Sequence, residues 1–292
     1  MSKGLLDPKV DFVFKNIFGS PNHPEILISF LNAKLKAKKK IVNVDIKKTD
    51  IEKQYIEDKY SRLDVKATTS NDEIINIEIQ LKNENNMVKR SLYYLSKMYE
   101  EQLNEKEDYS KLVRTVCINI LNFKYLKTDN FHTGYRFKEI ESNEELTDIM
   151  EVHFIEIPKL QDSSDEKDML VAWTEFLKDP ESEKVRGLEL SIEEIRQAKD
   201  ELIRMSNDST QRELYDMRAN SLRDKMSELN AAERKGIEKG REEGREEGRK
   251  EGIEEGRKEE KIEIARNMKL SGLDTNTIAK ITNLSEDEID KL

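Results

Sequence analysis

Apolar side chains recur at helical spacing in three segments of the N-terminal part of the chain. Residues 8–18 and 24–35 each place several aliphatic and aromatic side chains on one helix face, and Pro8 suits a first helical turn. Residues 87–104 show a rougher version of the same spacing. We therefore expect three helices before residue 105.

Runs rich in β-branched residues lie between and after these segments. Residues 61–68 and 74–81 flank a short polar turn and predict a β-hairpin. The continuous apolar run at 112–123 is typical of a central strand that is covered on both faces. The expected strands are 41–47, 61–68, 74–81, 112–123, 135–140 and 148–157. This order of elements predicts an α/β fold with a mixed sheet.

The pattern becomes helical after residue 165. Helices are expected around Trp173, which we predict to anchor a core, and over residues 191–204 and 207–229. From Gly236 to Gly256, glycine then recurs at every fourth position, between glutamate and basic residues.

Four-residue spacing keeps these glycines near one face of a helix, with a drift of about 40° per step. Each glycine costs a helix about 0.8–1 kcal/mol relative to alanine, so six cost on the order of 5 kcal/mol. Exposed ion pairs contribute only a few tenths of a kcal/mol each. The segment therefore either packs against another backbone, as a self-associating or docked helix, or serves as a charged, semi-flexible spacer.

Composition adds an uneven distribution of charge. The net charge is −10, but residues 1–130 carry 23 basic against 19 acidic side chains, whereas residues 131–292 carry 28 against 42. A basic patch at 34–40 can contact phosphates or form a solvated helix end. Charged residues make up 38% of the chain, which favours an extended, solvated helical part beside a compact one.

Several classes of protein are disfavoured. We find no run of eighteen apolar residues and no apolar N-terminal leader, so we expect a cytoplasmic protein without contact with a membrane. The single Cys117 excludes an internal disulfide and a cysteine zinc cluster, and we expect it to be buried. His23, His132 and His153 are far apart in the sequence and show no metal-ligand spacing.

The predicted hairpin carries the candidate chemistry. Side chains two apart on a strand share a face, so Asp64 and Lys66 would lie on the same face as Glu78, Gln80 and Lys82. Two carboxylates and a backbone carbonyl form a hard-oxygen site suited to Mg²⁺, whose bound water could attack phosphorus. The same alternation also fits the solvated face of an antiparallel sheet, which is the commoner case.

Four motifs in order resemble a known family. They are "DFVFKNIFG" at 11–19, "LDV" at 63–65, "NIEIQ" at 76–80 and "RSLYYLSKMYEEQL" at 90–103. The order and spacing resemble the Rpn family of recombination-promoting nucleases and transposase-like proteins, which have the PD-(D/E)XK nuclease fold. The resemblance covers residues 1–130 clearly and 131–230 loosely.

The resemblance implies roles for individual residues. Asp64 and Glu78 match the two acids that bind Mg²⁺, or Mn²⁺, in that superfamily. The third motif position is usually lysine but here is Gln80, which can orient water or phosphate and carries no charge. That leaves a charged role to Lys66 or Lys82.

Three further positions match recurrent polar residues of the family. Asp11, on the first predicted helix, resembles an acidic residue that completes some such sites. Arg90 and Gln102, on the third predicted helix, are candidates to reach the substrate backbone. Each of the three could equally be a surface or helix-capping residue.

The C-terminal segment resembles the small helix-turn-helix tails of Rpn-like proteins. Gly272 can end one helix, and Ser285 followed by Glu288 forms a capping box that begins another. Residues 262–292 carry 4 basic and 6 acidic side chains, so we do not expect strong phosphate affinity from the tail alone. A role in protein contact or assembly is favoured over one in reading DNA.

Together these observations predict a restriction-endonuclease-like α/β core followed by a helical C-terminal region. The expected segments are a core at 1–165, a helical extension at 166–230, a charged glycine-repeat helix or linker at 231–261 and a helical tail at 262–292. The expected function is Mg²⁺-dependent DNA hydrolysis by Asp64 and Glu78 with the Ile79 carbonyl, in recombination, mobile elements or phage defence. The alternative is an inactive or self-inhibited interaction module. In either case the helical C-terminal region is expected to form a homo-oligomer.

Overall fold

The computed structural model describes residues 4–35, 39–47, 50–51, 61–62, 64–165 and 167–292. Leu63, which belongs to the predicted strand 61–68, and part of the 34–40 patch lie outside these residues. The chain divides into two compact units, one ending at Leu222 and the other comprising Arg223–Leu292. The four-segment division made from the sequence remains a prediction.

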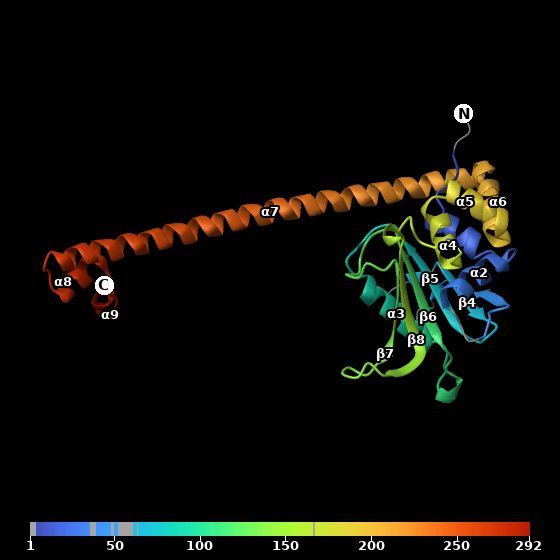
Figure 1. Ribbon diagram of the computed structural model, residues 1–292, viewed down its shortest axis with the longest axis horizontal. Helices are drawn as coiled ribbons and strands as arrows, with labels where there is room; N and C mark the ends of the chain where they lie inside the picture. The colour runs from blue at the N-terminus through green and yellow to red at the C-terminus, as the bar shows by residue number, and fades with distance from the viewer. Residues whose placement is uncertain (1–3, 36–38, 48–49, 52–60, 63, 166) are drawn as a thin grey trace. The chain divides into compact units, whose positions relative to one another are not determined.

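A mixed six-stranded sheet forms the centre of the first unit (Figure 1). In spatial order its strands are β1 Val44–Lys47, β4 Val65–Thr69, β5 Ile74–Gln80, β6 Thr115–Leu121, β8 Glu145–Glu156 and β7 His132–Lys138. The three central strands β5, β6 and β8 are parallel, and the other pairings are antiparallel. The predicted mixed sheet is confirmed.

The predicted strand at 61–68 is divided in the structure. Ser61–Arg62 forms β3, which pairs with β2 Asp50–Ile51 in a separate two-stranded sheet, and β4 begins only at Val65. Strand β6, in contrast, is buried at every position between its parallel neighbours, as its continuous apolar sequence predicted. Cys117 lies within it and is buried, also as predicted.

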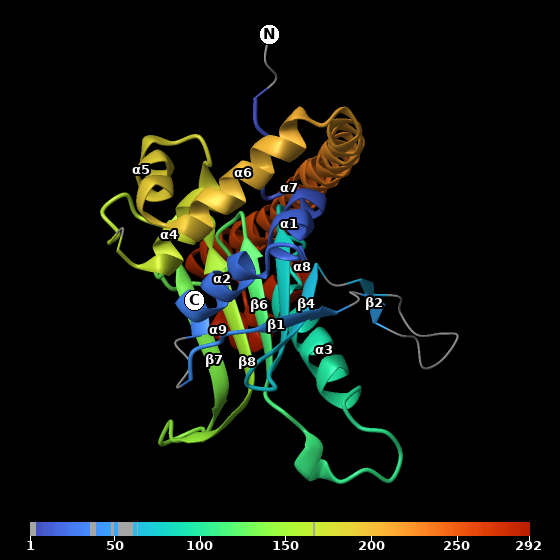
Figure 2. The same cartoon turned by 90° about the vertical axis from the view of Figure 1, so that its right-hand side faces the viewer.

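Helices cover both faces of this sheet (Figures 1 and 2). The helical elements of the first unit are α1 Asp11–Phe18, α2 Pro24–Leu35, α3 Met87–Glu100, the 3₁₀ turns Tyr109–Lys111 and Ile157–Lys159, α4 Met169–Lys178, α5 Glu183–Ser191 and α6 Glu193–Asn207. Helix α3 packs on one face with the apolar side chains of β6 and β8. Helices α1, α2, α4 and α6 share the core on the other face.

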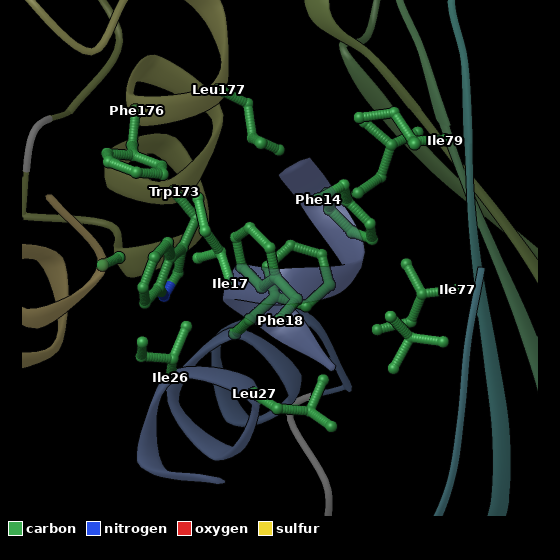
Figure 3. Packing of buried hydrophobic residues seen from close by; sticks show 14 of the residues in the cluster. Phe14, Ile17, Phe18, Ile26, Leu27, Ile77, Ile79, Trp173, Phe176 and Leu177 are labelled. Carbon is green, nitrogen blue, oxygen red and sulfur yellow. The ribbon is translucent and has the colours of Figure 1, made fainter. Parts of the chain in front are cut away.

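That second face holds the aromatic core (Figure 3). Phe14 and Phe18 of α1 stack with ring centroids 4.6 Å apart, and Trp173 of α4 meets Phe18 edge-on at 5.3 Å. These rings face Ile77 and Ile79 of β5, and Trp173 is fully buried, which confirms its predicted role as a core anchor. Full burial of each large side chain stabilises the fold by about 1.5–3 kcal/mol.

Helix α1 starts later than the sequence predicted. It begins at Asp11, because residues Asp7 to Val10 form a turn in which the Val10 N–H donates to the Asp7 carbonyl at 3.1 Å. Pro8 belongs to this turn and not to the helix. The register of α1 is fixed by four buried side chains, which are Val13, Phe14, Ile17 and Phe18.

A single helix, α7, extends over Ser209–Leu270 and therefore through all six glycines of the repeat. A Cβ added at any of these glycines would meet nothing within 4 Å. Pairs such as Lys239 with Glu243 and Lys250 with Glu246 line the helix at i,i+4 spacing. The sequence predicted either a self-associating or docked helix or a charged, semi-flexible spacer here, and the structure forms a helix.

The end of α7 packs with α8 Thr275–Thr282 and α9 Glu286–Asp290 in the second unit. Ala265, Ile278, Leu284 and Ile289 form a small buried cluster. Gly272 adopts φ +81° just after α7, a conformation that glycine tolerates best. The predicted capping box of Ser285 and Glu288 is present. Within the described residues, no helix combines the length and apolar composition needed to cross a membrane.

Candidate active site

Asp64 and Glu78 come together where β4 begins beside β5. The antiparallel register pairs Val65 with Ile77, so the preceding residue Asp64 lies next to Glu78. The Asp64 N–H donates to Glu78 Oε1 at 3.2 Å, and the Ile79 N–H donates to Asp64 Oδ2 at 2.9 Å. The structure thus joins the two acids and Ile79, the three residues that the sequence assigned to one metal site.

The Ile79 carbonyl projects from the same edge of β5 as its N–H, because both groups of a strand residue face the same neighbour. That neighbour would be β4, but β4 begins at Val65, opposite Ile77. The side chain of Asp64 therefore replaces the missing strand as the acceptor for the Ile79 N–H. An oxygen of the main chain and two carboxylates are consequently available along one short stretch of strand edge.

Each carboxylate contacts a basic side chain. Lys15 Nζ of α1 lies 3.3 Å from Asp64 Oδ1, and Arg90 Nη2 of α3 lies 3.2 Å from Glu78 Oε2. The Arg90 guanidinium also lies over the Tyr94 ring, 5.4 Å from its centroid. The two cations reach the acids from helices on opposite faces of the sheet.

Burial dominates the electrostatics of the pair. It raises the pKa of Glu78 to about 7, helped by the nearby Asp64 charge and opposed by Arg90. Burial also raises the pKa of Asp64, against the lowering effects of the Ile79 N–H and of Lys15. The site therefore holds two like charges at a desolvation cost that the neighbouring cations offset only in part.

Three other residues of the predicted hairpin, which are Gln80, Lys66 and Lys82, lie at different positions relative to the acid pair. Gln80 is the last residue of β5 and is partly buried. Lys66 lies opposite Asn76 and contacts Glu101, with 3.1 Å between Nζ and Oε2. Lys82 lies beyond the end of β5, so the strand alternation that placed it beside Gln80 does not extend to it.

Of the helical candidates, Asp11 and Arg90 lie near the acids and Gln102 does not. The Asp11 charge contributes to the raised pKa of Asp64, and its own carboxylate contacts Arg218 Nη1 at 2.8 Å. Gln102 instead bonds the start of β6, since its Nε2 donates to Thr115 Oγ1 at 2.8 Å and its Oε1 accepts from the Val113 N–H at 2.7 Å.

Sequence reasoning missed two residues of the site. Lys15 had no predicted role beyond its place in the motif at 11–19. Lys15 follows Asp11 by about one helical turn and so lies on the same face of α1, which was the available signal. Asn76 is fully buried and donates from Nδ2 to Glu78 Oε1 at 3.4 Å. Its position two residues before Glu78 on the same strand face was the available signal.

Another buried acid of the sheet lies outside this site. Glu151 of β8 accepts from Arg114 Nη2 at 2.7 Å and from His153 Nε2 at 2.8 Å, and it also contacts Arg136. His153 and His132, which are far apart in the sequence, are neighbours in the fold, with ring centroids 5.7 Å apart. The reason is the antiparallel β7–β8 pairing, which sets His132 opposite Ile155 and Gly134 opposite His153, so the two histidines are diagonal neighbours.

The basic patch also differs from expectation at its first lysine. Lys34 is buried, and its Nζ lies 2.7 Å from His153 Nδ1. It is therefore neither a solvated helix end nor exposed to a phosphate.

The donor atoms at Asp64 and Glu78 fit a hard divalent cation. Mg²⁺ is commonly held by one or two carboxylates and retains several waters, so two acids and a carbonyl suffice. Among the residues that the structure describes, no three His, Cys, Asp or Glu side chains gather to hold a metal ion. Side chains alone would thus supply two ligands here, and the shared cost of burying both acids is what a cation would relieve.

Comparison with known families decides the affiliation of the chain. Residues 8–232 match the profile of the PD-(D/E)XK nuclease family transposases. The chain belongs to this family. Residues 258–292 match the C-terminal helix-turn-helix domain of the Rpn/YhgA-like nuclease family, so the chain is an Rpn-type member. No curated protein and no solved structure matched the chain.

The Rpn affiliation agrees with the architecture. The mixed sheet flanked by helices is a PD-(D/E)XK nuclease fold, and the resemblance noted in the sequence is confirmed over most of the chain. The helix-turn-helix match covers α8 and α9, which confirms the predicted resemblance of the tail. In this Rpn-type chain the acid pair stands at the edge of β5, and Gln80 occupies the third motif position.

Proposed function

We propose that this Rpn-family protein is a divalent-metal-dependent DNA endonuclease that hydrolyses phosphodiester bonds at the edge of β5. The observation that supports the proposal most strongly is the juxtaposition of two buried acids, with a main-chain carbonyl beside them, in a nuclease-family fold. Mg²⁺ is the expected ion and Mn²⁺ the expected substitute. A substrate of this kind also accords with the cytoplasmic location expected from the sequence.

The residues divide the work as follows. Asp64 and Glu78 would hold the metal ion together with the Ile79 carbonyl. The ion would supply a polarised water and neutralise charge on the phosphate. Gln80, two residues after Glu78 on the same strand face, would orient that water or a phosphate oxygen through its amide. Asp11 would act at the periphery through its charge near Asp64.

A competing function has one observation in its favour. Lys15 and Arg90 already neutralise the acids, as they would in an interaction module whose acids serve structure alone. A self-inhibited nuclease is the intermediate case, in which removal of the chain after about residue 230 raises activity. An unchanged or lower rate after truncation would remove the support for self-inhibition.

Plasmid cleavage separates these functions. We expect the full chain to nick or linearise supercoiled DNA with Mg²⁺ or Mn²⁺. Asp64→Ala and Glu78→Ala should each reduce the rate at least about 100-fold, the loss typical of removing one electrostatic contributor. Cleavage that survives both substitutions would exclude the proposed site.

Glu175→Ala provides a matched control. Glu175 is buried like Glu78 and contacts Lys184, with 3.4 Å between Oε1 and Nζ, but it belongs to α4. A comparable loss of activity in this variant would show that the assay reports folding and not the site. The amounts of folded protein are therefore matched between variants by the fluorescence of Trp173, which is fully buried in the core.

We also propose that two copies associate in parallel along the glycine stripe of α7. One edge of the stripe carries Arg241, Arg245 and Arg249, and the other carries Glu243, Glu247 and Glu251. A two-fold axis parallel to the helices places the basic edge of one copy opposite the acidic edge of the other. An antiparallel pair would instead oppose like charges.

Single cysteines test this arrangement in the full chain. In parallel pairs, Gly244→Cys and Gly252→Cys should each form a disulfide with the same position of the second copy. An antiparallel pair centred between them would cross-link neither variant alone but would cross-link their mixture. Absence of cross-links in both experiments would contradict association along this stripe.

A further inference from the structure

The proposed reaction lacks a cation at the expected strand position. Hydrolysis of a phosphodiester gathers negative charge on the phosphoryl oxygens, and nucleases of this kind stabilise it with fixed positive groups. Gln80 stands at the third motif position and has no charge to contribute.

The two lysines that strand alternation suggested are poorly placed for this task. Lys66 Nζ contacts Oε2 of Glu101, which follows α3, at 3.1 Å. In the strand register Lys66 lies opposite Asn76 and not opposite Glu78. Lys82 follows the end of β5 and has left the strand alternation that would align it with Glu78.

Lys15 lies at the acid pair itself. Its Nζ is 3.3 Å from Asp64 Oδ1, and its side chain is 25% exposed. Helix α1 is anchored in the aromatic core by Phe14 and Phe18, the residues on either side of the turn that carries Lys15. Its backbone is therefore held rigidly while the long side chain remains adjustable.

We infer that Lys15 is the catalytic cation of this enzyme. From helix α1 it supplies the positive charge to the phosphoryl oxygens that Gln80 of β5 cannot supply. In the DNA-free structure it contacts Asp64, and with DNA bound its ammonium contacts the scissile phosphate. The inference rests on the proposed nuclease function and adds to it a phosphate contact from an element outside the hairpin.

A purely structural role for Lys15, in which it only neutralises Asp64, leads to different experimental outcomes from a phosphate contact. If it only neutralised Asp64, its removal would lower stability, and a lysine elsewhere would not restore activity. If it contacts phosphate, a lysine returned to position 80 should replace it, because the two positions serve the same oxygen atoms. The decisive variant is therefore Lys15→Ala combined with Gln80→Lys.

The first measurement is cleavage of a short DNA duplex with saturating Mn²⁺. We expect Lys15→Ala to lower kcat about 100-fold and Lys15→Arg to stay within about tenfold of the unaltered chain. The combined Lys15→Ala and Gln80→Lys variant should recover at least tenfold over Lys15→Ala alone. Failure of Gln80→Lys to restore activity in a folded protein overturns the inference.

Lys184→Ala is the matched control for lost lysine charge. Lys184 contacts the buried Glu175 at 3.4 Å and is exposed to a similar degree, 30% against 25% for Lys15. It should cleave at the unaltered rate. Thermal unfolding followed by Trp173 fluorescence identifies any variant whose loss is one of folding.

The second measurement does not depend on turnover. Binding of the same duplex is followed by fluorescence anisotropy with Ca²⁺ in place of Mn²⁺, over a range of salt concentrations. One lost phosphate contact reduces the slope of log Kobs against log salt by about 0.9. We expect that reduction for Lys15→Ala, its reversal by Gln80→Lys, and no change for Lys184→Ala.

The two measurements separate failure of the inference from failure of the proposed function. If the unaltered chain binds DNA but does not cleave it with any divalent ion, the nuclease proposal fails, and the salt slope still decides whether Lys15 contacts phosphate. If the chain cleaves DNA and Lys15→Ala changes neither kcat nor the slope, the nuclease proposal stands and the role of Lys15 is refuted.

Discussion

Two glutamates in neighbouring parts of the same sheet are buried to the same degree and have opposite electrostatics. Glu78 and Glu151 are each 1% exposed. Burial and the Asp64 charge raise the pKa of Glu78 to about 7. Burial acts in the same direction on Glu151, but hydrogen bonds from His153 and Arg114 outweigh it and lower its pKa to about 2.

The difference lies in the balance of charge around each carboxylate. Glu151 contacts two arginines and a histidine, and their hydrogen bonds and charges stabilise its ionised form, although Arg114 also contacts Glu73 and Arg136 also contacts Glu145. Glu78 contacts one arginine and lies beside Asp64, which contacts Lys15, so the charge of each acid opposes ionisation of the other. An acid whose ionised form is stabilised contributes to the fold, whereas an adjacent acid pair that its neighbouring cations offset only in part retains affinity for a further cation, and such perturbed pairs are characteristic of functional sites.

The largest expected effect is on stability at Glu151. Glu151→Ala leaves Arg114, Arg136 and His153 without their shared acceptor, and we expect a loss of about 3–5 kcal/mol. Urea unfolding followed by Trp173 fluorescence measures it. Glu145→Ala is the control, because Glu145 contacts the same Arg136 at 2.9 Å but is 43% exposed, and it should cost less than about 1 kcal/mol. Equal losses at both positions would remove the distinction drawn here.

The next effect is the pH dependence of Glu78. An acid whose folded pKa is about 7, against 4.5 in the unfolded chain, binds more protons when folded, so its contribution to stability falls as pH rises from 4.5 to 7. The fall is about 3 kcal/mol at most. Glu78→Gln should remove it, measured without divalent ions as the difference in unfolding free energy from the unaltered chain.

Glu151 provides a comparison for this prediction, because its contribution to stability changes with pH in the opposite direction. With a lowered folded pKa of about 2, its contribution is complete above pH 4.5 and is lost only as pH falls toward 2. Glu151→Gln should therefore leave the slope between pH 5 and 7 unchanged. If that variant flattens the slope and Glu78→Gln does not, the assignment of the two acids is reversed.

A smaller effect is expected from divalent ions. A ligand at ten times its Kd stabilises the folded state by about 1.4 kcal/mol. Mg²⁺ or Mn²⁺ should raise the unfolding free energy by this amount in the unaltered chain and not in Asp64→Asn, whereas Glu145→Ala should keep the gain. Stabilisation that persists in Asp64→Asn would place the ion elsewhere.

The smallest effect concerns the ion pair between Lys66 of β4 and Glu101, the residue that follows α3. Both side chains are about one-fifth exposed and are screened by solvent, so we expect a coupling energy under about 1 kcal/mol. A double-mutant cycle with Lys66→Ala and Glu101→Ala measures it. A coupling above 2 kcal/mol would mean that Lys66 is held as firmly as the cations around Glu151.

Local patterns in the sequence were sufficient for most of the elements. The largely apolar run of β6, the spacing of α2 and the capping box at Ser285 are each determined by neighbours in the chain, and the structure confirms all three. The proximity of Asp64 to Glu78 was also predictable, because a short turn limits how two strands can pair.

Other features depended on contacts between distant segments. The packing of α1 brings Lys15 to Asp64 across 49 positions, and the β7–β8 pairing sets His132 opposite Ile155, which makes it a diagonal neighbour of His153. The sequence left a helix and a spacer open for the glycine repeat, because helix propensity alone could not decide between them, and the structure forms the helix. Sequence periodicity records which face a residue occupies, but which charges meet there is decided by packing, and packing set the opposite pKa shifts of Glu78 and Glu151.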